Sequence, residues 1–142
     1  MREILFRGKT PSQDEHFDDG EWKEGFYTCF NGKEHRIYSG YAETDCGDYY
    51  PDWCNVRPET VGQYTGLTDK NGTRIFEGDI LKYKSIKNEN KIGYVMYGTG
   101  CFSVKNIYSE NRPAIDIVLF ETKNEVEVIG NIHDNPELLK EV

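Results

Sequence analysis

Long hydrophobic runs are absent from this 142-residue sequence, and so is any sustained helical periodicity of its apolar residues. No apolar run approaches the roughly 18 residues that a membrane-spanning helix requires. The opening residues, MREILFRGK, lack the apolar core of a signal peptide. We therefore expect a cytoplasmic protein that makes no membrane contact and keeps its four cysteines reduced.

Compact metal-binding motifs are also lacking. The cysteines show no C-x2-C pair, which is the usual pattern of a small zinc site; they are Cys29, Cys46, Cys54 and Cys101. Because unpaired intracellular cysteines usually behave as small, partly buried thiols, we predict no metal ion and no cofactor. A structural zinc ion and a disulfide between Cys46 and Cys54 are the weaker alternatives.

Motifs for catalysis are missing as well. The chain has no Gly-x-Ser-x-Gly elbow, and Gly98–Gly100 is too short for a dinucleotide fingerprint and lies between two predicted strands. The most suggestive pair is His133 and Asp134, but sequence neighbours usually point apart, and Asp134 is better explained as starting a final helix. We predict no catalytic residue and no enzymatic activity, with an enzyme as the third-ranked alternative.

Positive charge is in short supply. Lysine and arginine total 17 against 25 aspartates and glutamates, so the formal net charge is −8. An acidic surface repels phosphate backbones, so we do not expect non-specific nucleic-acid binding. A nucleic-acid mimic, or a binder that uses one local patch, remains an alternative.

Aromatic residues and glycines are plentiful, at 13% aromatic residues and 14 glycines, a mixture that favours β-structure with many turns. Asn31-Gly32 predicts a hairpin turn, and Gly25 predicts a bulge or bend within its strand. We expect strands at residues 3–7, 21–30, 34–39, 80–83, 92–97, 101–104, 114–120 and 125–129. In the last of these, the alternation EVEVI places Val126 and Val128 on one face.

The stretch Val61–Tyr83 holds two turn signals between apolar residues. Asp69–Gly72 predicts a hairpin, since Asp can accept a hydrogen bond from the backbone two residues on, and Glu77–Asp79 predicts a tight turn at Gly78. The residues Asp69, Asn71 and Gly72 match part of a calcium-loop sequence pattern, but the first ligand and the final bidentate carboxylate of that pattern are both missing. The stretch therefore predicts fold rather than a metal site.

The segment Gly40–Asn55 is acidic and aromatic, and its length together with Pro51 predicts an irregular excursion or binding loop. Exposed aromatic side chains make good interface anchors, so the candidate binding residues for a partner protein are Tyr49, Tyr50 and Trp53. The alternative is that this loop is a lid, with Trp53 in a minor core.

The end of the chain carries a helix signal. Asn135 can cap a helix, Pro136 suits its first position, and Glu137 suits its positive end. We expect a short C-terminal helix that packs through two leucines.

Three segments carry a family resemblance: GEWKEGFY at Gly20–Tyr27, ETVGQYTGLTDKNGTRIFEGDIL at Glu59–Leu81, and IGNIHDNPELL at Ile129–Leu139. Their order resembles that of the YopX-like family of phage and prophage proteins, over nearly the whole chain. The resemblance implies a mainly β protein, with an N-terminal β-hairpin extension over residues 1–58 and an SH3-like small barrel over residues 59–142. It implies no catalytic residues.

These observations favour a prophage accessory protein that acts as a non-enzymatic protein-interaction module. We expect its partner to be a phage or host protein. Self-association is a further expectation, because the open edges of a small barrel invite strand pairing.

Overall fold

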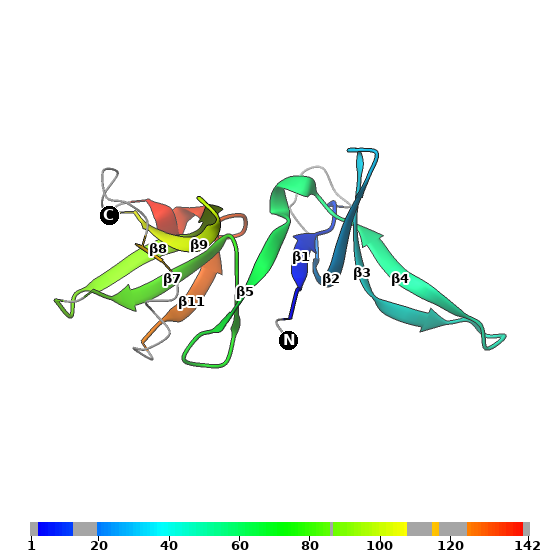
Figure 1. Ribbon diagram of the computed structural model, residues 1–142, viewed down its shortest axis with the longest axis horizontal. Coiled ribbons are helices and arrows are strands. Elements are labelled where there is room, and N and C mark those ends of the chain that lie inside the picture. Colours follow the sequence, from blue (N-terminus) through cyan, green and yellow to red (C-terminus); the bar gives the residue numbers. More distant parts are fainter. Residues whose placement is uncertain (1–2, 13–19, 86, 108–114, 117–124, 141–142) are drawn as a thin grey trace. The chain divides into compact units, whose positions relative to one another are not determined.

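A computed structural model describes residues 3–12, 20–85, 87–107, 115–116 and 125–140. The chain divides into two units, Met1–Gln63 and Tyr64–Val142. Both units consist mainly of antiparallel β-strands, which confirms the mainly β prediction (Figure 1). No helix among the described residues has the length and apolar character needed to cross a membrane.

The first unit is an antiparallel sheet with the order β4-β3-β2-β1, followed by the start of β5. Its strands are β1 (Phe6–Lys9), β2 (Trp22–Phe30), β3 (Glu34–Glu43), β4 (Tyr49–Asn55) and β5 (Gly62–Thr68). The turn between β2 and β3 contains Asn31 and Gly32 at φ values of 53° and 66°, as the predicted hairpin requires. A short 3-10 helix, Pro58–Thr60, leads into β5.

The segment Gly40–Asn55 is not an irregular loop, and that prediction is wrong. β3 continues to Glu43, and β4 returns beside it over its whole length (Figure 1). The register of this pairing shifts between Tyr38 and Gly40. Proline is tolerated in an edge strand, and β4 is the outer strand of this sheet, so Pro51 does not prevent strand formation.

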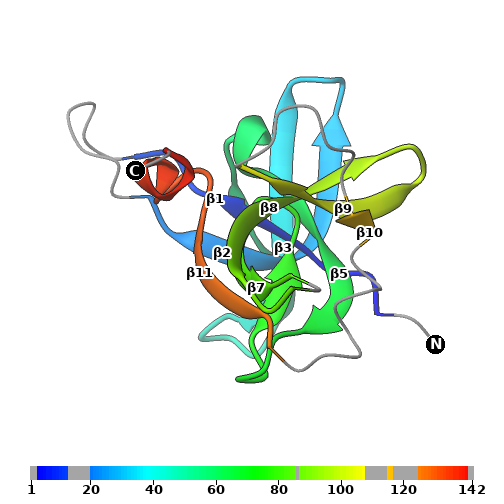
Figure 2. The ribbon, with the colours of Figure 1, turned by 90° about the vertical axis from the view of Figure 1, so that its left-hand side faces the viewer.

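The second unit contains a five-stranded antiparallel sheet with the order β10-β9-β8-β7-β11, which Figure 2 shows from a second direction. It also contains the hairpin between the end of β5 and β6. Its strands are β6 (Arg74–Phe76), β7 (Asp79–Lys84), β8 (Asn90–Gly98), β9 (Cys101–Asn106), β10 (Ile115–Asp116) and β11 (Glu127–Asn131). The rest of the strand predicted over 114–120 lies outside the described residues.

The core of this unit is a cluster of buried apolar side chains. Val126 belongs to it and Val128 packs against it, which confirms the face predicted from the EVEVI alternation. The other members are Ile75, Leu81, Tyr83, Val95, Phe102 and Val104.

Two aspartates stabilise the turns of the central stretch; the role of Asp69 was predicted from its position, and that of Asp79 was not. Asp69 is buried and accepts a hydrogen bond from the N–H of Asn71 at 2.9 Å, which closes the turn two residues on. Asp79 is buried after Gly78, which has a φ of 90°, and it accepts a hydrogen bond from the N–H of Phe76 at 2.8 Å.

Two details of the predicted fold need correction. Within the described residues the second sheet does not close into a barrel, because its edges are β10 and β11 while β5 and β6 pair in the other sheet. The expected C-terminal α-helix is absent, and Pro136–Leu139 form one 3-10 turn instead. Asn135 does not cap this turn, because its Oδ1 accepts a hydrogen bond from the N–H of Asn131.

Candidate functional site

Strand register in the first unit gathers aromatic side chains on one face of the β2–β3–β4 sheet. Phe26 lies opposite Tyr38, which lies opposite Trp53, and Glu43 lies opposite Tyr49. Directly opposed residues of antiparallel strands share a face, and every second residue of a strand returns to it. We call this surface the aromatic face; its members are Phe26, Phe30, Tyr38, Tyr41, Tyr49 and Trp53.

Most of the aromatic face is open to solvent. The exposed fractions are 63% for Phe26, 43% for Phe30, 77% for Tyr41, 72% for Tyr49 and 42% for Trp53. Exposed large side chains that occur singly are ordinary, whereas these five are grouped on one face of one sheet.

Arg36 organises the centre of the aromatic face. Its guanidinium lies 3.9 Å from the ring centroid of Trp53 and 5.0 Å from that of Phe30. Its Nη2 also donates to Glu34 Oε2 at 2.9 Å. These contacts fix the cation between two rings, and cation–π attraction at such distances contributes about 0.5–1 kcal/mol at exposed sites. These contacts hold the Arg36 side chain in one position at the centre of the face.

The structure separates the three candidate residues predicted from the sequence. Tyr49 and Trp53 lie on the aromatic face, whereas Tyr50 pairs with Ala42 on the opposite face. Trp53 is partly exposed and does not form a minor core. Sequence reasoning missed Phe26, Phe30 and Tyr41. The first two could have been found from their spacing of four residues in a strand whose register Asn31-Gly32 sets.

The opposite face carries a short line of polar contacts. Tyr27 Oη lies 2.6 Å from His35 Nδ1, and His35 Nε2 lies 3.9 Å from Cys29 Sγ. Burial raises the pKa of the Tyr27 phenol and Cys29 adds to the effect, so the phenol is protonated at neutral pH. When it donates to Nδ1, the imidazole proton lies on Nε2 and points toward sulfur. In that tautomer His35 cannot act as a base for the Cys29 thiol.

All four cysteines are free thiols, and no disulfide joins Cys46 to Cys54. No group of three metal-ligating side chains occurs in the described part of the chain. The backbone N–H groups of His133 and Asp134 both donate to Asn131 Oδ1, at 3.0 and 2.9 Å. These hydrogen bonds hold the backbone of His133 and Asp134 in the turn that precedes the final 3-10 turn.

Cys54 should react more slowly than the exposed thiols Cys46 and Cys101. Burial raises the pKa of Cys54, nearby Lys23 partly offsets the rise, and Asp52 adds to it, so less thiolate is present at pH 7–8. We expect alkylation by iodoacetamide to be several-fold slower at Cys54, as measured by mass spectrometry of timed samples. Equal rates in the folded protein would contradict this, and equal rates in urea serve as the control.

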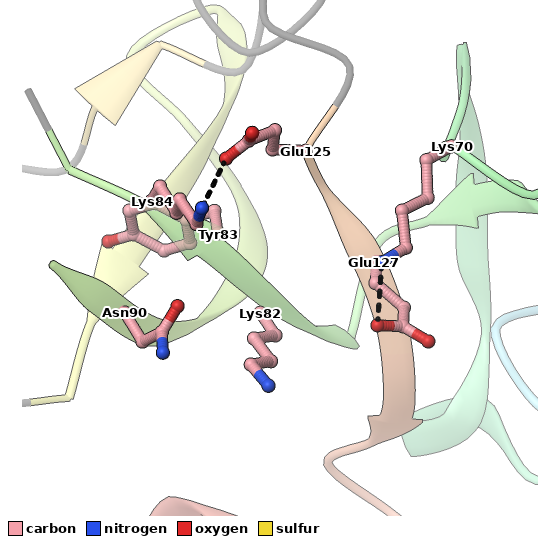
Figure 3. Close-up of a pocket in the computed structure, with 7 residues that line it drawn as sticks. All are labelled: Lys70, Lys82, Tyr83, Lys84, Asn90, Glu125 and Glu127. Carbon is pink, nitrogen blue, oxygen red and sulfur yellow. Dashed lines mark ion pairs between the residues drawn. The ribbon is translucent and has the colours of Figure 1, made fainter. Parts of the chain in front are cut away.

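The second unit carries a pocket of about 320 Å³ beside β7 and β11 (Figure 3). Lys70 Nζ lies 3.3 Å from Glu127 Oε2, and Lys84 Nζ lies 3.3 Å from Glu125 Oε2. The other lining residues are Lys82, Tyr83 and Asn90. Burial raises the pKa of Tyr83, so its phenol is neutral at physiological pH. Two of the three ammonium groups are thus already paired, and exposed pairs of this kind contribute at most about 1 kcal/mol.

The solved structures include one of similar fold over the full length of both chains. It is the crystal structure of protein EF1440 from Enterococcus faecalis, with 25% sequence identity and a TM-score of 0.61. The alignment covers 99% of this chain and 100% of the other. No curated protein matches the sequence.

The family comparison is more specific. A family model described as YopX protein matches residues 6–140, which is nearly the whole chain and includes both units. The motifs at Gly20–Tyr27, Glu59–Leu81 and Ile129–Leu139 all lie inside the matched region. This protein therefore belongs to the YopX family.

Proposed function

We propose that this protein is a non-enzymatic accessory protein of a phage or prophage, and that it binds a partner protein through the aromatic face. The observation that carries the proposal is the exposure of five large aromatic side chains on one face of one sheet. Tyrosine, tryptophan, phenylalanine and arginine are the residue types enriched in protein interfaces and their energetic hot spots.

Energetics supports a partner for this surface. Fully burying one large apolar side chain contributes about 1.5–3 kcal/mol relative to leaving it exposed. In the isolated chain the five exposed rings of the aromatic face do not contribute this free energy of burial, and a partner that covers them would gain it on binding. Part of that gain is offset by the entropy lost on association.

The second unit fits the role of a supporting module. Its last strand returns to pair beside β7 after the β7-β8-β9-β10 meander, and this order supports the SH3-like relationship that we propose. We therefore keep an SH3-like relationship for residues 59–142 as part of the proposal, without a closed barrel.

A photo-crosslinking experiment tests the site. A benzophenone amino acid would replace Tyr49 in one variant and Tyr50 in another, in cells that naturally produce the protein. Because the two neighbouring tyrosines lie on opposite faces, we expect a discrete crosslinked protein from position 49 and at least several-fold less from position 50. An additional probe at Tyr41 should capture the same protein.

Two outcomes at these crosslinker positions would contradict the proposal. The same crosslinked species at both positions would show that proximity and not the aromatic face governs capture. Absence of any crosslinked protein at both Tyr41 and Tyr49 would overturn the proposed function.

A single-stranded nucleic acid is the second candidate partner, because bases stack on aromatic side chains that are displayed on a sheet. Arg36 on the aromatic face favours it. The four carboxylates of residues 37–56 oppose it, because negative charge repels a phosphate backbone.

A further inference from the structure

The part of the β3–β4 hairpin that follows Arg36 is acidic. Residues 37–56 contain four carboxylates and no lysine or arginine: Glu43, Asp45, Asp48 and Asp52. All four residues are exposed, and none forms a salt bridge with another described residue. Residues 37–56 therefore carry net negative charge, of which the part at Asp52 is offset by the nearby Lys23 of β2.

One of these carboxylates lies on the aromatic face itself. Glu43 is directly opposite Tyr49, so both side chains project from the same face of the sheet. Side chains opposed in this way have Cβ atoms about 4.5–5.5 Å apart. Asp52 directly precedes Trp53 in β4 and therefore lies on the opposite face, as Tyr50 does beside Tyr49.

The aromatic face already binds one cation from within the chain, the guanidinium of Arg36. The Arg36 guanidinium stacks over the Trp53 ring and simultaneously bonds to the Glu34 carboxylate. Tyr49 and Glu43 repeat the combination of ring and carboxylate at the outer end of the same face, and residues 37–56 contain no lysine or arginine that could occupy it. A guanidinium from outside can lie on the Tyr49 ring and pair with Glu43 in the same manner.

On the basis of the proposed function, we propose that the partner of the aromatic face is an extended, arginine-bearing segment of another protein. Its arginines stack on Tyr41 and Tyr49 and pair with the carboxylate of Glu43, while its apolar residues cover Phe26 and Phe30. Arginine suits this role better than lysine, because its planar guanidinium stacks on rings and pairs with carboxylates in two-point contacts.

Other occupants carry the wrong charge. A second copy of this chain would bring an identical acidic hairpin to the interface, and like charges brought together in an interface oppose binding. A phosphate backbone would meet the same repulsion. Charge complementarity therefore selects a cationic protein segment among the occupants that an aromatic surface could accept.

Fluorescence anisotropy with defined probes tests this inference on the full chain. Three labelled peptides of equal length would share the same apolar residues and carry arginine, glutamine or glutamate at alternate positions, and labelled oligothymidylate would be the fourth probe. We expect the arginine peptide to bind at least about tenfold more tightly than the glutamine peptide, with the glutamate peptide and oligothymidylate weaker still. Its affinity should fall as salt concentration rises.

Variants assign the effect to the hairpin. Glu43→Gln should reduce the preference for arginine over glutamine several-fold, and Glu89→Gln, an exposed carboxylate of the second unit, should leave it unchanged. Tyr41→Ala with Tyr49→Ala should weaken binding of the arginine peptide about tenfold or more, whereas Tyr50→Ala should not.

The inference and the proposed function fail in different ways. Equal affinity for the arginine and glutamine peptides, preference for oligothymidylate, or no binding of the arginine peptide would each overturn the arginine-bearing partner. The proposed function would still stand in those cases if Tyr49 captured a protein that Tyr50 did not. Concentration-dependent dimerisation that the Tyr41→Ala, Tyr49→Ala variant abolishes would instead identify a second copy as the occupant.

Discussion

Replacing Asp69 with alanine should destabilise the second unit by about 3 kcal/mol. The carboxylate accepts hydrogen bonds from the N–H groups of Asn71 and Thr73 through Oδ1, both at 2.9 Å, and from that of Val128 through Oδ2 at 3.0 Å. The first two close the β5–β6 turn, and the third fastens this turn to β11, which is distant in sequence. Each donor left unsatisfied costs about 1–3 kcal/mol where water cannot replace the carboxylate. Chemical denaturation followed by circular dichroism would measure the loss.

The same contacts predict a pH dependence. Burial alone would raise the pKa of Asp69, but hydrogen bonds from Val128, Thr73 and Asn71 outweigh it and lower the pKa below its ordinary value of 3.8. Because the folded-state pKa is depressed, the stabilisation is fully present above the unfolded-state pKa. It is lost as pH falls through the folded-state value. The Asp69→Ala variant should lack this part of the acid sensitivity.

Two control variants separate the hydrogen bonds of the Asp69 carboxylate from the general effect of removing a negative charge. Asp69→Asn retains an oxygen for the turn but places an amide N–H group against the Val128 N–H, so it should cost roughly half as much as alanine. Glu89→Ala removes an equal charge from an exposed pair with Lys91 and should change stability by less than about 0.5 kcal/mol. A loss below about 1 kcal/mol for Asp69→Ala would contradict the role assigned to this carboxylate.

Gly25→Ala should destabilise the first unit by about 3 kcal/mol and should distort the aromatic face. Gly25 has a φ of 159°, and a Cβ atom there would lie 2.0 Å from the carbonyl oxygen of Tyr38. Both atoms belong to paired backbone, so relief requires β2 and β3 to separate, and overpacking of this kind costs typically about 1–3 kcal/mol or more. Hydrogen exchange should show faster exchange of the amides from Phe26 to Phe30.

A second glycine isolates the clash from ordinary backbone strain. Gly47 has a φ of 82° in the β3–β4 turn, with no atom within 4 Å of the position of a Cβ atom. Gly47→Ala should therefore cost only about 1 kcal/mol, from the left-handed backbone conformation. Similar losses for the two variants would show that close packing against Tyr38 is not what requires Gly25.

The local parts of this fold could be predicted from the sequence because short-range chemistry decides them. Asn31-Gly32 and Asp69–Gly72 form the predicted turns, and Val126 and Val128 face the core as their alternation indicated. The β3–β4 hairpin was missed because the pairing of its strands is not encoded locally, and its one proline is acceptable only in an edge strand.

The candidate site was predicted in part for a related reason. The register shift between Tyr38 and Gly40 reverses which face the later residues of β3 occupy, and a one-residue shift moves every following side chain to the other face. Tyr49 and Trp53 could be nominated by residue type, but the face of Tyr50 could not. The prediction of a C-terminal helix is wrong for a similar reason. The Oδ1 atom of Asn135 accepts a hydrogen bond from the N–H of Asn131 and does not cap the following turn.

Both tryptophans of the chain, Trp22 and Trp53, lie in the first unit, and each has a guanidinium over its ring. Arg7 lies 4.7 Å from the Trp22 centroid, and Arg36 lies 3.9 Å from that of Trp53. Tryptophan emission is therefore a label for the first unit, and one of its two sources, Trp53, lies on the aromatic face. Because the surroundings of an indole ring set the colour and intensity of its emission, the protein carries its own optical reporter of whatever covers Trp53.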